Sequence, residues 1–165
     1  MASSIGFYSL FFGLCFSFLI ILISLKNFRN SKSFNNNIIS LTFLQLFFVV
    51  VSFLGLITSF VNSDFSNETV YNHSHTTIPL FYKISGTWGN HEGSLLLWLL
   101  VLTLFIILFI IESKKQPKRY RIFTILFQQI IILGFLVFLL KTSNPFNFIF
   151  PPPKEGLGLN PILQD

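Results

Sequence analysis

The apolar stretch Gly93–Ile111, GSLLLWLLVLTLFIILFII, decides the fold class of this chain. It carries no charged side chain, and a helix of about 17–25 residues is long enough to cross the hydrocarbon core of a membrane. Three further runs of this kind are present: Ile5–Leu25, Ile38–Val61 and Ile122–Leu140. Because backbone N–H and C=O groups in lipid need partners within the segment, helices are favoured. We therefore predict an all-α, polytopic membrane protein with four transmembrane helices.

The composition of the 165-residue chain agrees with a membrane location. It is 52% hydrophobic and 10% charged, whereas a soluble domain carries about 25% charged residues. The single cysteine, Cys15, lies within an apolar run, and no CxxC or CxxCH motif occurs. These facts exclude an internal disulfide, a Cys-based zinc site and self-attached c-type haem. The net charge of +5 flanks the apolar runs, so it indicates topology rather than a nucleic-acid partner.

The positions of the charges predict the orientation of the chain. Eight of the eleven basic residues lie in the connections after the first and third runs: Lys26, Arg29, Lys32, Lys114, Lys115, Lys118, Arg119 and Arg121. The positive-inside rule places these connections in the cytoplasm or mitochondrial matrix, and we assign them no further role. Both termini, residues 62–92 and the tail from Lys141 are then expected on the outer side. The expected domains are a four-helix transmembrane domain, 1–140, and an outward Pro/Gly-rich tail, 141–165.

The third run is preceded by an unusual polar and aromatic stretch, TWGNHEGS, residues 87–94. Trp88, His91, Leu95 and Trp98 are spaced i, i+3, i+7 and i+10, so one helical stripe would carry them. The tryptophans could be interfacial anchors of an aromatic belt. His91 could be a satisfied interfacial histidine, a haem or metal ligand, or a residue that shapes a haem pocket, and we favour the pocket interpretation over axial ligation.

The start of this helix is expected near Thr87 or Asn90, since either side chain could cap free N–H groups. Glu92 in the first turn suits the positive end of the helix dipole. Gly89 and Gly93 would allow another backbone or a flat ligand to approach closely. A helix N-terminus also attracts anions, and haem propionates are anions.

Other polar residues carry weaker signals. His73 and His75 could bind a metal, but two ligands are weak support for such a site, and a solvated loop is favoured. Gln45 and the adjacent Gln128 and Gln129 lie within apolar runs. Polar residues at this depth mark either helix contacts or a cavity, and we favour contacts.

Two segments of the chain resemble the CcmF family, membrane proteins of cytochrome c maturation described as haem lyases. WGNHEGSLLLW, residues 88–98, is similar to the family's WGxHEGSxxLW stretch, and GLGLNPILQD, residues 156–165, is similar to its LNPxLQD stretch. The matching positions are Trp88, Gly89, His91, Glu92, Gly93, Ser94, Leu159, Asn160, Pro161, Leu163, Gln164 and Asp165. The family's tryptophan-rich segment and its haem-ligating histidines are missing here. The chain therefore resembles the N-terminal piece of a split CcmF.

The resemblance implies a subunit of a haem lyase that helps to attach haem covalently to apocytochrome c, and that is inactive alone. The implied cofactor is haem, with axial ligands on a partner chain. The implied partners are the remaining CcmF pieces, the haem chaperone CcmE, a CcmH-type protein, apocytochrome c and the bilayer. The candidate residues at the rim of a haem pocket are Trp88, His91, Glu92, Trp98 and Asn160.

Residues with AT-rich codons, such as Phe, Asn, Ile and Lys, are plentiful. This AT-rich residue usage favours the mitochondrial inner membrane, with a bacterial inner membrane as the alternative. A different class of function also remains open. The chain could be a non-catalytic four-helix membrane protein, such as an assembly factor or transporter subunit, in which WGNHEGS is an interfacial anchor.

Overall fold

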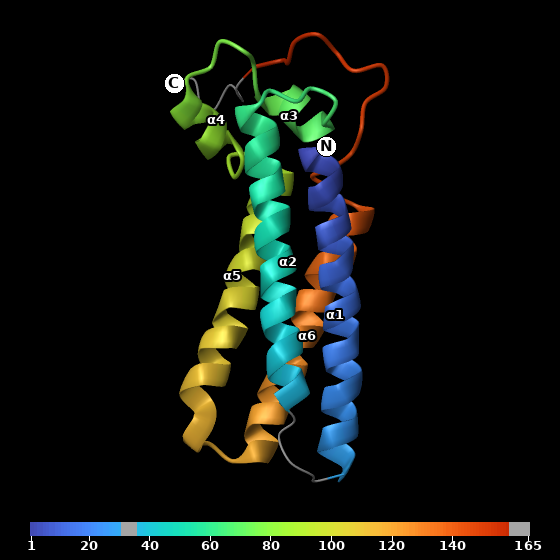
Figure 1. Ribbon diagram of the computed structural model, residues 1–165, viewed down its shortest axis with the longest axis vertical. Coiled ribbons are helices and arrows are strands. Elements are labelled where there is room, and N and C mark those ends of the chain that lie inside the picture. The colour runs from blue at the N-terminus through green and yellow to red at the C-terminus, as the bar shows by residue number, and fades with distance from the viewer. Residues whose placement is uncertain (31–35, 159–165) are drawn as a thin grey trace.

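The computed structural model describes residues 1–30 and 36–158 of the chain, and its main body is a bundle of four long helices (Figure 1). These four helices are long and apolar enough to cross a membrane, which confirms the predicted fold class. In the described residues there is no β-strand, only an isolated bridge between Asn67 and Phe148. The helices are α1 (Ala2–Asn30), α2 (Asn36–Val61), α3 (Glu68–His73), α4 (Leu80–Gly86), α5 (His91–Glu112), the 3-10 helix η1 (Ser113–Lys115) and α6 (Lys118–Lys141).

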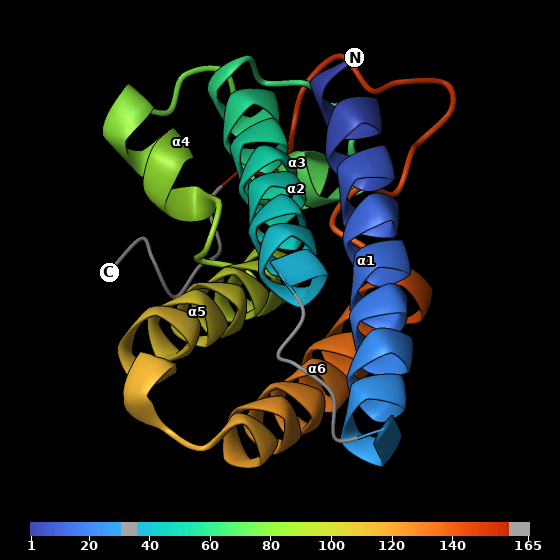
Figure 2. The same ribbon diagram turned by 60° about the horizontal axis from the view of Figure 1, so that its bottom comes forward.

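Each of the four apolar runs lies inside one long helix, and the helices continue for some residues into the polar flanks. Around the bundle, α1 packs against α2 and α6, and α5 packs against the same two helices (Figure 2). Helices α1 and α2 approach closely at a pair of glycines. A Cβ on Gly55 would lie only 3.1 Å from the Cα of Gly6 and from the carbonyl oxygen of Ala2. Small residues permit such backbone contact between membrane helices.

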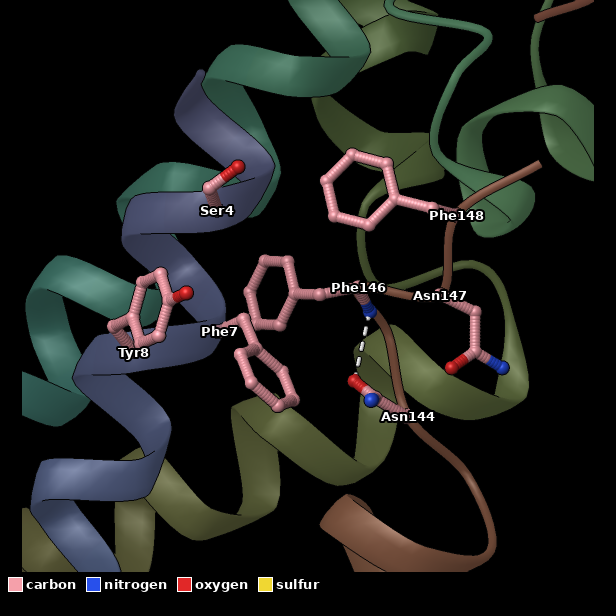
Figure 3. A pocket seen from close by; sticks show the side chains of 7 residues that line it. All are labelled: Ser4, Phe7, Tyr8, Asn144, Phe146, Asn147 and Phe148. Carbon is pink, nitrogen blue, oxygen red and sulfur yellow. Dashed lines mark hydrogen bonds between the residues drawn. The ribbon is translucent and has the colours of Figure 1, made fainter. Parts of the chain in front are cut away.

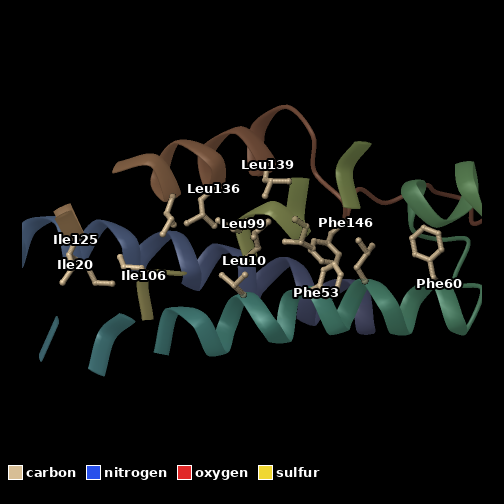
Figure 4. Packing of buried hydrophobic residues seen from close by; sticks show 14 of the residues in the cluster. Leu10, Ile20, Phe53, Phe60, Leu99, Ile106, Ile125, Leu136, Leu139 and Phe146 are labelled. Carbon is tan, nitrogen blue, oxygen red and sulfur yellow. The ribbon is translucent and has the colours of Figure 1, made fainter. Parts of the chain in front are cut away.

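The interior of the bundle is lined by aliphatic and aromatic side chains from all four long helices (Figure 4). Leu10, Ile20, Ile106, Ile125 and Leu136 are among the side chains that have no exposed surface. In lipid such packing is a main source of helix association, because lipid tails are as apolar as these side chains.

A polar bridge crosses this apolar interior and joins three helices. Gln129 Nε2 on α6 donates to Gln45 Oε1 on α2 at 2.8 Å. Ser17 Oγ on α1 donates to Gln129 Oε1 at 2.8 Å. The neighbouring Gln128 points to a different helix, where its Nε2 donates to the carbonyl oxygen of Leu102 on α5 at 3.1 Å. The expectation that these amides make helix contacts is confirmed.

One basic residue in the first turn of α6, Arg121, is buried, although the sequence predicted no role for it beyond topology. Arg121 donates from Nε to Ser113 Oγ and from a terminal nitrogen to the Ile110 carbonyl oxygen, both at 3.1 Å. The last carbonyls of a helix have no partner within it. Arg121 therefore supplies a hydrogen-bond donor to a carbonyl group in the last turn of α5. The prediction that the basic residues serve only topology was wrong for this residue.

Candidate functional site at the capped end

One end of the bundle, here called the capped end, carries the N-terminus, residues 62–90 and residues 142–158 (Figure 1). Helix α3 lies over this end, and the tail after α6 returns to it. Four backbone N–H groups join the tail to the connection after α2, over 2.8–3.1 Å: Glu68 to Asn147, Ile149 to Ser66, Leu157 to Tyr71 and Gly158 to Ser74. The solvated loop expected around His73 and His75 is therefore an ordered platform on which the tail docks.

Asn67 holds this junction together. Its Oδ1 accepts hydrogen bonds from the backbone N–H groups of Thr69 and Val70, so it caps the N-terminus of α3. Its Nδ2 donates to the Pro145 carbonyl oxygen at 3.0 Å and to Ser3 Oγ at 3.2 Å. The side chain has no exposed surface. One buried amide thus connects α3, the tail and the first turn of α1.

Helix α5 begins at His91, and Asn90 is its N-cap, which decides between the two predicted capping residues. Asn90 Oδ1 accepts a hydrogen bond from the Gly93 N–H at 2.7 Å, and its Nδ2 donates to the Gly86 carbonyl oxygen at 2.8 Å. Thr87 instead lies at the C-terminus of α4. A Cβ on Gly93 would collide with the Thr87 carbonyl oxygen. The turn between the two helices is therefore what requires glycine at this position.

The predicted stripe of tryptophan and histidine is only partly helical, because Trp88 precedes α5. Trp88 is 42% exposed and Trp98 is 61% exposed. His91 lies on the exposed surface, with its Nδ1 at 3.4 Å from Ser143 Oγ in the tail. Of the predicted rim residues in the described part of the chain, only Glu92 lines either of the two pockets discussed next. Asn160 lies outside the described residues.

Glu92 contributes to a polar pocket of about 220 Å³ between α3, the start of α5 and the tail. Both carboxylates of this pocket, Glu68 and Glu92, belong to the first turn of a helix, where negative charge is stabilised by the helix dipole. Burial lowers the pKa of the nearby His73, and the charge of Glu92 partly opposes this shift. The pocket is lined by Glu68, Thr69, Asn72, Glu92, Thr142, Ser143, Asn144 and Asn147.

An aromatic pocket of about 320 Å³ lies between the start of α1 and the tail (Figure 3). The ring of Phe146 is almost fully buried and lies against Gly6, where a Cβ would collide with it. The lining residues are Ser4, Phe7, Tyr8, Asn144, Phe146, Asn147 and Phe148. Asn144 and Asn147 line both pockets, so the tail segment 144–147 separates them. This segment was not predicted to line a pocket. The run PFNF, residues 145–148 shortly after the last span, was a sequence signal for it.

The remaining histidine of the polar connection, His75, has protein partners on both ring nitrogens. Its Nδ1 lies 2.9 Å from Thr77 Oγ1, and its Nε2 lies 3.7 Å from Glu155 Oε1 in the tail. Glu155 also accepts hydrogen bonds from the backbone N–H and the hydroxyl of Thr76. The backbone N–H of Thr76 is the main cause that lowers the pKa of Glu155. Within residues 1–30 and 36–158, no group of three or more His, Cys, Asp or Glu side chains could hold a metal ion.

The four membrane-spanning helices, with an ordered capped end that contains two pockets, define a polytopic helical membrane protein. Residues 88–165 match the family described as cytochrome C assembly protein. The chain is 50% identical over 121 residues to the cytochrome c-type biogenesis protein CycK of Bradyrhizobium diazoefficiens, which covers 73% of this chain and 18% of the relative. It is 35% identical over 166 residues to NrfE of Haemophilus influenzae, with 100% of this chain and 26% of the relative covered.

A solved structure, the cytochrome c haem lyase CcmF, superimposes with a TM-score of 0.81 at 26% identity. The superposition covers 89% of this chain and 25% of that one. The chain belongs to the cytochrome c assembly protein family, and the resemblance to CcmF is confirmed. It spans about a quarter or less of the length of these relatives.

Proposed function

We propose that this chain is one part of a haem lyase of cytochrome c maturation, which helps to attach haem covalently to apocytochrome c. The observation that carries the proposal is the junction at the capped end. It brings tail residues 142–158, which directly precede the LNPILQD motif in the sequence, onto the same end of the bundle as the WGNHEGS motif. The names of the relatives and of the solved structure support the same activity.

The chemistry places few demands on the residues of this chain. In thioether formation a substrate thiol adds across a vinyl group of haem, so the lyase needs no cysteine of its own. Cys15 lies in the spanning helix α1, far along the chain from the motif. What a lyase supplies is the position of the cofactor and of the apocytochrome.

No histidine lines the aromatic or the polar pocket. We therefore assign the axial ligands to a partner chain and derive no step through haem held here. We propose that one set of residues of this chain contributes to the edge of a haem pocket whose remainder belongs to a partner chain. These residues are Trp88, His91, Glu92, Trp98 and Asn160. The partners would be the remaining CcmF pieces, CcmE, a CcmH-type protein and apocytochrome c.

The charges support an orientation of the chain in the membrane. The basic residues in the last turns of α1 and between Lys114 and Arg121 lie at the end opposite the cap. The positive-inside rule therefore supports an outward capped end and outward termini. The AT-rich residue usage supports the mitochondrial inner membrane, whereas the relatives named above are bacterial, so a bacterial inner membrane is the alternative.

The test exchanges Trp88 and His91 for alanine in the assembled maturation system and measures the yield of holocytochrome c by haem staining. We expect a loss of roughly tenfold at unchanged chain abundance, because misplacing groups around a reacting centre is costly. Tyr120→Ala, an exposed aromatic at the opposite end, is the matched control and should leave the yield unchanged. An unchanged yield in the double variant would favour a non-catalytic assembly factor or transporter subunit.

A further inference from the structure

Helix α4 packs against the side of α2 near the C-terminus of α2. Gly86 packs against the ring of Phe60, and a Cβ at this glycine would lie 3.5 Å from the ring. Lys83 Nζ donates to Ser63 Oγ at 2.6 Å. These contacts fix the level of α4 along the bundle: it lies beside the last turn of α2 and just before the first residue of α5.

Three consecutive large side chains of α4 are exposed. Leu80 is 59% exposed, Phe81 76% and Tyr82 48%. The only charged residue of the helix, Lys83, is engaged with Ser63. Three consecutive large side chains left in water would be unfavourable, and exposed apolar patches of this kind mark membrane or protein contacts.

We propose that the face formed by Leu80, Phe81 and Tyr82 lies in the boundary between lipid headgroups and acyl chains, so that α4 is an interfacial anchor of the bundle. Its level supports this occupant, because the spans of α2 and α5 end and begin beside it, at Val61 and His91. A short helix at that depth buries its apolar side chains about 5–10 Å into the boundary.

The lateral position of α4 points to the same occupant. In Figures 1 and 2 it lies at the periphery of the bundle on the side of α5, whereas α3 lies over the end of the bundle. Helix α5 is a candidate span, and its Phe105 is more than half exposed. The helix beside α4 therefore carries apolar surface suited to lipid. Tyrosine, with an apolar ring and a polar tip, is enriched at this depth.

Spin labelling tests the anchor with the full chain in phosphatidylcholine vesicles. The native cysteine is removed by Cys15→Ser, and a nitroxide is placed at Phe81→Cys or Tyr82→Cys. Thr77→Cys, exposed in the polar part of the same connection, is the aqueous control, and Phe105→Cys in α5 is the lipid control. Collision of each label with molecular oxygen, which concentrates in lipid, and with a water-soluble nickel chelate is then measured.

For positions 81 and 82 we expect oxygen collisions between those at positions 77 and 105, and nickel collisions about fivefold below those at position 77. Labels at 81 and 82 that match position 77 in both collision rates would overturn the proposal. So would labels shielded from both reagents, because that result would indicate a protein partner on this face. The lipid contact does not depend on haem-lyase activity and would survive a negative result in the holocytochrome assay.

Discussion

Gln129 shows how one side chain can set the register of three spans. It exchanges hydrogen bonds with Gln45 on α2 and accepts one from Ser17 on α1, and all three side chains are fully buried. Hydrogen bonds between membrane helices contribute about 0.6–2 kcal/mol each. A slip of one helix along another would separate these partners and leave buried amide groups unsatisfied.

Replacing this residue by leucine tests that account. Gln129→Leu should lower the free energy of unfolding by about 1–3 kcal/mol, because Gln45 and Ser17 lose a buried partner. Unfolding by SDS in mixed micelles measures the effect. Gln128→Leu is the matched control, since it removes one hydrogen bond, to the Leu102 carbonyl, and should cost less. Equal losses in the two variants would contradict a special role for Gln129.

Gly93 offers a second test at the level of one atom. Gly93→Ala should destabilise the protein by about 1–3 kcal/mol, because the new methyl group collides with the Thr87 carbonyl oxygen and disturbs the Asn90 cap. Gly134→Ala in α6 is the control, since no atom lies within 4 Å of the added Cβ. It should be stabilising by up to about 1 kcal/mol through helix propensity. Thermal melting in detergent distinguishes the two, and a neutral Gly93→Ala would refute the close contact.

Among the elements, the two short helices of the capped end were not predicted, and the reason is physical. Helices α3 and α4 have six and seven residues, too few to show a helical period, and isolated helices of this length are marginal in water. They form because residues distant in sequence hold them: Asn67 and the tail for α3, Phe60 and Ser63 for α4. Hydropathy, in contrast, located the four spans, because each is a long uncharged run.

The docking of the tail on the polar connection should depend on pH through Glu155. Its folded-state pKa lies below the ordinary value, chiefly because the Thr76 N–H donates to it. The contribution of Glu155 to docking is therefore present above the ordinary glutamate pKa and is lost as pH falls through the lowered folded-state pKa. Hydrogen exchange at the Leu157 and Gly158 amides, which donate to Tyr71 and Ser74, reports the docked state.

At neutral pH, Glu155→Gln should speed exchange at both amides severalfold, because the amide is a weaker acceptor than the carboxylate. Lys154→Gln is the control on the neighbouring residue and should leave the exchange rates unchanged. If Glu155→Gln exchanged like the unmodified chain, the carboxylate would have no part in docking.

At the scale of the whole molecule, the sequence predicted the number of spans and the family, but not the neighbours of each span. The order of α1, α2, α5 and α6 around the bundle depends on contacts such as Gly6 with Gly55, which no local pattern reveals. The two pockets escaped prediction for the same reason. They combine residues near position 7, near 70 and near 145, and only the folded chain brings these together.

The buried amide of Asn67 also constrains the order in which the protein can be completed during synthesis. Its acceptor, the Pro145 carbonyl, lies 78 residues further along the chain. At ribosomal speeds of about 5–20 residues per second, the acceptor is made roughly 4–16 s later. Until α6 and the residues after it have been made, the nascent segment around Asn67 must satisfy its polar groups with water. Completion of the last span is therefore the event that allows the connection after α2 to reach its final structure.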